Sequence, residues 1–197
     1  VLTPEQMERF LHIVGTYFPL TYPGLEFTME ANPGTVDGEK LAVMRSGGVN
    51  RLSFGVQSFD NGLLRRIGRI HDTDDVYRSL EDARRAGFRN ISIDLMFGLP
   101  EQTLATLDAT LDAALALGLP HCSIYSLKVE ENTLFYTLYR NNQLPLPDED
   151  EEAEMYRLII RRLTEAGYKQ YEISNFAKPG YESRHNCAYW RNESYYG

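Results

Sequence analysis

Short apolar runs alternate with amphipathic stretches along this 197-residue chain. Helical spacing of apolar residues in the amphipathic stretches predicts a helix ahead of each apolar run. The apolar runs that predict strands are "LEFTMEANPG", "RLSFGVQ", "NISIDLMF", "HCSIYSL" and "KQYEISNFA". Five helix-then-strand units favour a parallel sheet with helices packed outside it.

Capping residues predict where several of these helices begin. Thr3 is placed to cap the first helix, with Gln6 completing a capping box. Asp60 is placed to cap a helix directly after the second strand. Asp72 or Thr73 is placed to cap the helix beyond it. These signals support the helix-then-strand order.

The length of the chain limits the architecture. A complete eight-fold barrel needs about 250 residues. We therefore expect an α/β fold that makes a partial barrel as one domain, 1–197. The connection 128–147 is long for a compact domain, and long connections are often functional lids.

Composition excludes several classes of protein. The net charge of −8 argues against a nucleic-acid partner, because such partners select a basic face. No run of about 18 apolar residues predicts a membrane span, and "VLTPEQMERF" resembles no signal peptide. Cys122 and Cys187 are too few for a disulfide framework, so we expect a cytoplasmic protein.

Polar residues follow the predicted strands at their carboxyl ends. In parallel α/β folds, ligands bind at this end of the sheet. We therefore expect the polar residues to converge on one rim and form a binding site. They are Glu30 and Asn32, Gln57 and Ser58, Asp94, Tyr125 and Ser126, and finally Glu172, Ser174 and Asn175.

Two charged features stand out near this rim. Asp94 lies between Ile93 and Leu95, and a buried carboxylate needs hydrogen-bond partners. Ligand hydroxyls such as those of a ribose satisfy it, and so do backbone amides of a neighbouring loop. The segment "RRIGRIH" is basic, and one of its arginines near the strand ends would hold a carboxylate in bidentate fashion. Position alone does not identify which arginine.

Six motifs in order resemble the radical S-adenosylmethionine (SAM) superfamily. They are "EANPGT", "NRLSFGVQSFD", "IGRIH", "IDLMFGLPEQT", "YEISNFAKPGY" and "HNCAYW". Within it the chain is similar to the oxygen-independent coproporphyrinogen III oxidase-like subgroup, and most to its branch of HemW-type haem chaperones. The resemblance implies a partial (βα)6 TIM-like barrel with SAM at the carboxyl ends of the strands.

The resemblance also implies roles for four residues. Glu30 would lie near the methionine end of SAM, and Arg69 would pair with its carboxylate. Gln57 and Asp94 would bind the ribose hydroxyls. Each role suits the chemistry, because an amide and a carboxylate accept from a diol and a guanidinium matches a carboxylate.

The chain departs from the family at its cluster site. The family holds a [4Fe–4S] cluster through a CxxxCxxC motif, followed by a "GGGTPS" segment, and neither is present. We expect both to precede Val1, so that the chain is an interior piece without the first strands and the C-terminal region. Because a cluster needs thiolates, we assign no catalytic residue or metal ligand here and expect this chain alone not to cleave SAM.

The segment "HNCAYW" matches the HNxxYW pattern of the HemW branch, which implies haem binding. His185 would be the axial ligand, with Tyr189 and Trp190 packed on the porphyrin face. Cys187 is an alternative ligand as a thiolate. The alternative without a ligand is an ordinary surface or core histidine.

Three functions remain open at this point. The first is a HemW-like protein that binds SAM and a [4Fe–4S] cluster when complete, and that transfers haem to acceptor proteins. The second is the oxygen-independent coproporphyrinogen III oxidase, which decarboxylates propionate side chains in porphyrin biosynthesis. The third is a non-catalytic fragment that only folds.

Overall fold

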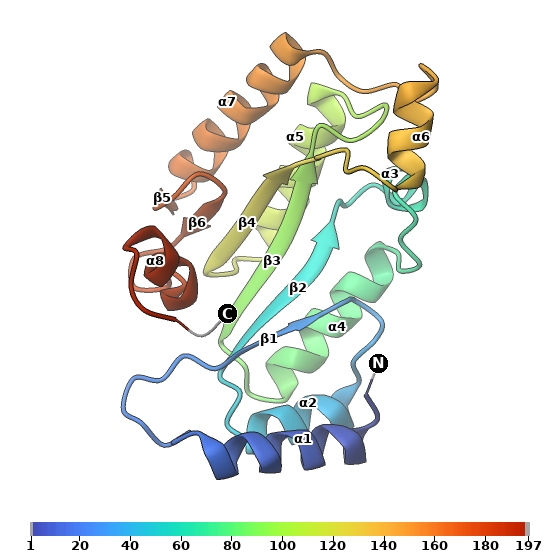
Figure 1. Cartoon of the computed structure of the whole chain (residues 1–197). Helices are drawn as coiled ribbons and strands as arrows, with labels where there is room; N and C mark the ends of the chain where they lie inside the picture. Colours follow the sequence, from blue (N-terminus) through green and yellow to red (C-terminus); the bar gives the residue numbers. More distant parts are fainter. Residues whose placement is uncertain (1, 196–197) are drawn as a thin grey trace.

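A computed structural model describes residues 2–195 (Figure 1). At its centre lies one six-stranded sheet with the order β1-β2-β3-β4-β6-β5. The strands are β1 Thr28–Ala31, β2 Arg51–Gln57, β3 Asn90–Phe97, β4 His121–Ser126, β5 Lys169–Gln170 and β6 Asn175–Ala177. Strands β1 to β4 pair in parallel, so their carboxyl ends meet at one edge.

Helices such as α4 and α5 cover one face of this sheet, α8 lies on the other, and α6 lies beyond the carboxyl ends of the strands (Figure 1). The helices are α1 Pro4–Tyr17, α2 Gly38–Ser46, α3 Asn61–Arg66, α4 Thr73–Arg85, α5 Leu104–Ala116, α6 Leu134–Arg140, α7 Glu149–Glu165 and α8 Arg184–Trp190. The expected α/β partial barrel is confirmed as an open sheet, because β1 and β5 form its two ends.

Alternation along β2 shows how the two faces differ. Leu52, Phe54 and Val56 are fully buried in the apolar core, against the outer helices. Arg51 and Ser53 alternate with them and line a cavity on the opposite face. Because side chains of a strand alternate between faces, the sheet has an apolar outside and a polar inside.

The capping predictions are confirmed. Thr3 and Gln6 form a capping box at α1, and Asp60 accepts hydrogen bonds from the first turn of α3. Asp72, rather than Thr73, caps α4. Asp72 has the extended backbone of a cap residue, whereas Thr73 is already helical.

The prediction of one parallel last strand is wrong. "KQYEISNFA" forms β5 and β6, which pair antiparallel with each other, and β6 runs antiparallel to β4. The backbone N–H of Tyr171 donates to Asn175 O at 3.2 Å, which closes a turn between them. The carboxylate of Glu172 accepts from Ser174 N at 3.1 Å inside this turn. Local hydrogen bonds thus reverse the chain where the apolar pattern alone indicates continuation.

The long connection 128–147 contains α6, and each of the 7 residues of this helix is at least partly exposed. Pro145 O accepts a hydrogen bond from Glu101 N at 2.9 Å, which fastens the connection to the segment after β3. Its role as a lid stays a prediction.

Candidate functional site

Four side chains from separate elements line one cavity of about 480 Å³ on the inner face. Glu30 lies on β1, Gln57 ends β2, Arg69 follows α3, and Asp94 lies on β3. We call this the Arg69 cavity. These are the four residues that the resemblance assigned to SAM, and the fold brings all of them together.

Gly55 lies at the centre of the polar groups of this cavity. Arg69 Nη2 donates to Gly55 O at 2.8 Å. A Cβ atom on Gly55 would lie 2.7 Å from Arg69 Nη2, and 3.1 Å from both Asn32 Oδ1 and Gln57 Nε2. These three polar side chains can therefore converge only because Gly55 has no side chain. Arg69 Nε is buried without a hydrogen-bond partner in the described chain, so the guanidinium retains a donor for a ligand.

The basic side chains of "RRIGRIH" make different contacts. Arg69 is the arginine that faces the strand ends, and burial lowers the pKa of its guanidinium while the nearby Asp94 opposes the shift. Arg66 forms an exposed ion pair with Glu101 at 2.5 Å. His71 is buried, with Nε2 placed 3.1 Å from Val56 O. Only Arg69 of these three lines the cavity.

A distorted strand end aims Gln57 at the cavity. The pairing of β2 with β3 shifts register between Gly55 and Gln57, and Gln57 has φ 69°. A positive φ is uncommon outside glycine, and functional sites concentrate such strain. The next residue, Ser58, is fully buried and lies 3.3 Å from Thr110 Oγ1 on α5. Gln57 thus faces inward while Ser58 fastens the strand end to the outer layer.

Asp94 is held by hydroxyls of the neighbouring strands. Ser53 Oγ on β2 lies 3.0 and 3.2 Å from its two carboxylate oxygens. Ser123 on β4 contributes a further side-chain hydrogen bond. Burial raises the pKa of Asp94, and these hydroxyls partly oppose the shift. Cross-strand serines therefore take the place of the loop amides that we considered as partners.

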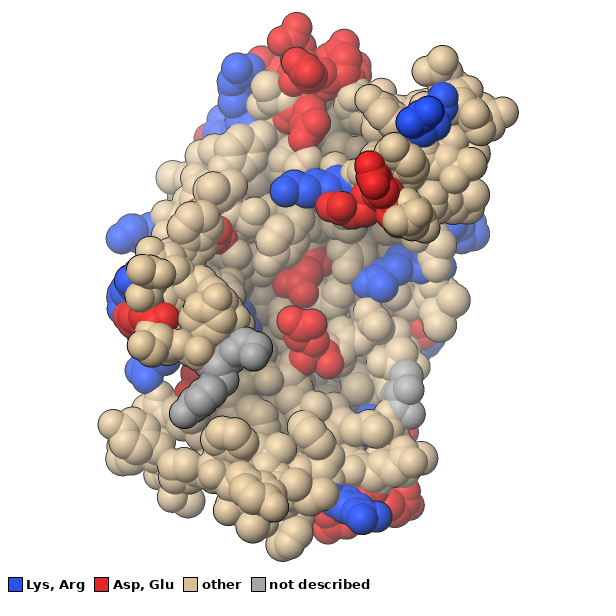
Figure 2. Space-filling model, in the orientation of Figure 1, with Lys and Arg blue, Asp and Glu red and all other residues tan. Residues whose placement is uncertain are grey.

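A second cavity of about 690 Å³ adjoins the first, because Glu30 and Asp94 line both. Arg51 and Ser53 line it from β2, and His185 lines it from α8. We call this the Arg51 cavity. Figure 2 shows acidic side chains in the hollow of this inner face. The residues that the resemblance assigns to SAM and the predicted haem ligand therefore line neighbouring cavities.

Glu26 anchors the helix that carries His185. Its carboxylate accepts from Arg184 N at 3.1 Å and lies 3.4 Å from the hydroxyl of Ser183, the N-cap of α8. A carboxylate at a helix N-terminus satisfies free N–H groups and suits the helix dipole. Sequence analysis missed this contact, because Glu26 and α8 lie far apart in the chain.

A buried hydrogen-bond chain supports α8 from the sheet. Tyr171 Oη lies 3.3 Å from Ser183 N and 3.4 Å from Asn186 Nδ2, both at the start of α8. The same hydroxyl lies 2.8 Å from His121 Nε2, and His121 Nδ1 lies 2.7 Å from Ser92 Oγ. Sequence analysis missed His121 and Tyr171. The sequence contained one signal for this hydrogen-bond chain, namely a histidine at the start of the apolar strand β4.

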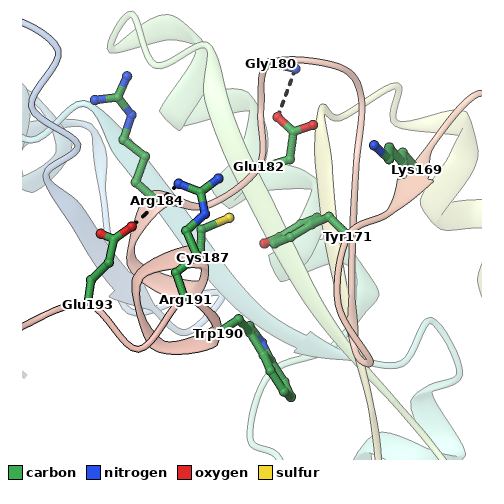
Figure 3. Close-up of a pocket in the computed structure, with 9 residues that line it drawn as sticks. All are labelled: Lys169, Tyr171, Gly180, Glu182, Arg184, Cys187, Trp190, Arg191 and Glu193. Carbon is green, nitrogen blue, oxygen red and sulfur yellow. Dashed lines mark hydrogen bonds and ion pairs between the residues drawn. The ribbon is translucent and has the colours of Figure 1, made fainter.

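The aromatic residues of "HNCAYW" separate around α8. His185 and Tyr189 pack edge-on, with ring centroids 4.8 Å apart. Trp190 instead lines another pocket with Tyr171 and Cys187, as Figure 3 shows. The rings of Tyr189 and Trp190 thus lie on different sides of α8 in the ligand-free chain, and their packing on a porphyrin face stays a prediction. On a seven-residue helix, a residue five positions after His185 lies on another side.

Comparison with known proteins decides the family. Residues 3–114 match the model of the radical SAM superfamily. The chain belongs to the radical SAM superfamily. It is 48% identical to "Heme chaperone HemW" of Bacillus subtilis (strain 168), across 100% of this chain and 52% of that protein. It is 42% identical to the protein of the same name from Escherichia coli (strain K12), across 100% of this chain and 51% of that protein.

A solved structure supports the fold assignment. "Coproporphyrinogen III oxidase (HemN) from Escherichia coli", described as a radical SAM enzyme, matches with a TM-score of 0.78 and 26% identity. The match covers 96% of this chain and 43% of that chain. The chain thus spans about half the length of the curated relatives it matches. It is a HemW-like member of the radical SAM superfamily with the partial TIM-like fold.

Some polar residues that were expected at the binding rim lie outside both cavities. Ser126, Glu172 and Ser174 line a third, mainly apolar groove of about 1000 Å³. Ser126 Oγ donates to the carboxylate of Glu152 on α7. The strand ends therefore converge from β1 to β3, and the reversed β5–β6 turn carries the last polar residues away.

Two features are absent from residues 2–195, the part of the chain that the structure describes. Within this range, no three or more His, Cys, Asp or Glu side chains are grouped to hold a metal ion. Cys122 and Cys187 are both free, and burial raises the pKa of the Cys122 thiol. Over the same residues, no helix has the length and apolar character needed to cross a membrane.

Proposed function

We propose that this chain is the SAM-binding part of a HemW-like protein that binds haem and transfers it to acceptor proteins in the cytoplasm. The observation that carries the SAM assignment is the Arg69 cavity, where the four assigned side chains converge from separate elements. The haem assignment rests on His185, on its place in the Arg51 cavity, and on the similarity to proteins named haem chaperones.

The residues of the Arg69 cavity fit the parts of SAM. Arg69 retains an unpaired donor that suits the methionine carboxylate. The carboxylate of Asp94 and the amide of Gln57 suit the ribose hydroxyls. Glu30 lies beside Asp94, close enough for its charge to raise the pKa of Asp94. When bound beside a reduced [4Fe–4S] cluster, SAM supplies the radical chemistry of the family. In this proposal the cluster ligands belong to the complete protein, outside residues 1–197.

His185 is the proposed axial ligand of haem. Neutral imidazole is a common iron ligand. The side chain is exposed on α8, and Glu26 and Tyr171 fix the start of this helix. We therefore expect His185→Ala to weaken haem binding at least tenfold and to change the Soret spectrum. A haem titration followed by absorbance measures both.

His12→Ala is the matched control, because His12 is also exposed but lies on α1. It should titrate like the wild type. Equal spectra and equal affinity for wild type and His185→Ala would reject His185 as the ligand. Loss of binding in His12→Ala as well would indicate that haem associates with surface histidines without a defined site.

The second candidate function is coproporphyrinogen III decarboxylation. The structural similarity to HemN favours it, at a TM-score of 0.78, although sequence identity is higher to proteins named HemW. The cluster-reconstituted complete protein distinguishes the two functions. We expect haem binding without release of carbon dioxide from coproporphyrinogen III. Turnover of that substrate would establish the oxidase instead.

A further inference from the structure

Arg51 is a buried cation whose side chain makes no hydrogen bond or ion pair within the described chain. It lies at the start of β2, and only 5% of the residue is exposed. Its Nε atom has no hydrogen-bond partner in the described chain, and among residues 2–195 the guanidinium forms no ion pair. A charge removed from water without compensation costs several kcal/mol. The charge of Asp94 compensates Arg51 in part, because Arg51 lies close enough to lower the pKa of Asp94. The guanidinium still keeps donors that no group of the described chain uses.

A second unpaired polar group lies in the same place. Thr28 Oγ1 on β1 is buried without a hydrogen-bond partner in the described chain, and Thr28 lines the Arg51 cavity together with Arg51. In the register of the sheet, Thr28 lies directly opposite Arg51. Two neighbouring residues with unused hydrogen-bond donors thus line one cavity, and both side chains are suited to an anion.

The rest of the cavity indicates the kind of molecule that carries the anion. Tyr22, Phe27 and Tyr125 supply aromatic surface, and His185 supplies an imidazole from α8. Arg69 and Gln57 line the other cavity. A ligand in the Arg51 cavity therefore meets a cation, aromatic surface and the proposed iron ligand, beside the carboxylates of Glu30 and Asp94.

We propose that Arg51, assisted by Thr28, binds a carboxylate of the molecule whose iron His185 holds, namely a propionate of haem. This inference rests on the proposed haem binding and deepens it. The other source of a carboxylate is SAM. Haem is favoured because Arg51 and His185 share a cavity, whereas Arg69 is the guanidinium in the cavity proposed for SAM.

The test compares haem with haem dimethyl ester, in which both propionates are neutral. Arg51→Met should weaken haem binding about tenfold to a hundredfold, the effect of losing a charge-assisted hydrogen bond. It should leave the affinity for the ester unchanged. Arg51→Lys should fall between wild type and Arg51→Met for haem, because it keeps the charge without the bidentate geometry. Arg161→Met, a change at an exposed arginine on α7, is the control for altered net charge.

Stability separates a ligand-binding role from a structural one. Thermal unfolding of the ligand-free chain should occur at nearly the same temperature in Arg51→Met. The variant removes a buried charge that makes no hydrogen bond or ion pair, and this gain offsets the lost attraction to Asp94. A structural arginine predicts a clearly lower temperature, and that result would overturn the proposal. Equal loss of haem and ester affinity would overturn it as well.

Two further results have distinct meanings. A loss of SAM affinity in Arg51→Met, with haem affinity unchanged, would overturn the haem assignment and identify SAM as the source of the carboxylate. A wild-type chain that binds neither haem nor its ester would reject the proposed haem function itself, and this inference with it.

Discussion

Single residues inside this sheet owe their properties to neighbours on adjacent strands. Asp94 is flanked by apolar residues in the sequence, yet Ser53 and Ser123 on either side give it hydrogen bonds. Arg51 has no such partner in the described chain. The same polar inner face therefore holds two neighbouring charges, of which only Asp94 has hydrogen bonds from the described chain, and the unused donors of Arg51 are the better indicator of a ligand.

His121 is a second residue controlled by its surroundings. Burial, followed by the charge of Arg51, lowers the pKa of its imidazole from 6.5 to about 3. Tyr171 accepts from Ser183 and Asn186, so its own hydrogen is available to His121 Nε2, and His121 Nδ1–H then donates to Ser92. Protonation of Nε2 would break this chain, which favours the neutral ring.

The depressed pKa of His121 predicts an acid sensitivity. Below pH 6.5 the unfolded chain takes up a proton that the folded chain does not bind. The free energy of unfolding therefore falls as the pH drops from 6.5 toward 3, by up to about 1.4 kcal/mol per pH unit from this group. His121→Asn should show a shallower fall over this range in urea titrations at several pH values. His12→Asn should keep the wild-type slope, and an unchanged slope in His121→Asn would contradict the assignment.

At the scale of elements, α8 depends on contacts made by its first turn. The helix has seven residues, too few for independent stability in water. Its N-terminus is held by Glu26 from the segment before β1 and by Tyr171 from the turn after β5. The position of His185 is therefore determined by residues outside its own motif.

Removing one of these contacts should loosen α8 more than the rest of the chain. Tyr171→Phe deletes the hydroxyl that accepts from Ser183 N and Asn186 Nδ2 and that lies 2.8 Å from His121 Nε2. The loss of the contacts to α8 should cost about 1 kcal/mol. Hydrogen exchange of the α8 amides should accelerate by roughly fivefold, while the core strands β2 and β3 remain protected. Tyr139→Phe on exposed α6 is the matched control. Uniform acceleration across the whole chain would mean that Tyr171 supports the global fold instead.

At the scale of the whole molecule, β1, β2, β3 and the segment after α3 all contribute to the Arg69 cavity. A ligand that contacts all of them stabilises the folded state by mass action. In the cluster-reconstituted complete protein, SAM at 100 times its Kd should add about 2.7 kcal/mol to the free energy of unfolding. Asp94→Ala should lose most of this gain at the same SAM concentration. Asp74→Ala, at an exposed position on α4, should retain it, and equal thermal shifts in all three proteins would remove Asp94 from the site.

Much of this architecture follows from the sequence alone. The alternation of Leu52, Phe54 and Val56, and the caps at Thr3 and Asp60, depend on local spacing and local hydrogen bonds, so they are readable from the chain. The motif resemblance placed Gln57 and Arg69 in one site, and the comparisons confirm the family.

Only the tertiary structure decided the remaining features. The antiparallel pairing of β6 with β4 and the anchoring of α8 by Glu26 arise from contacts between segments far apart in the chain. The unpaired state of Arg51 is visible only once its neighbours are known. The physical reason is that periodicity determines which face a side chain occupies, whereas partners and burial depend on what the other strands bring to that face.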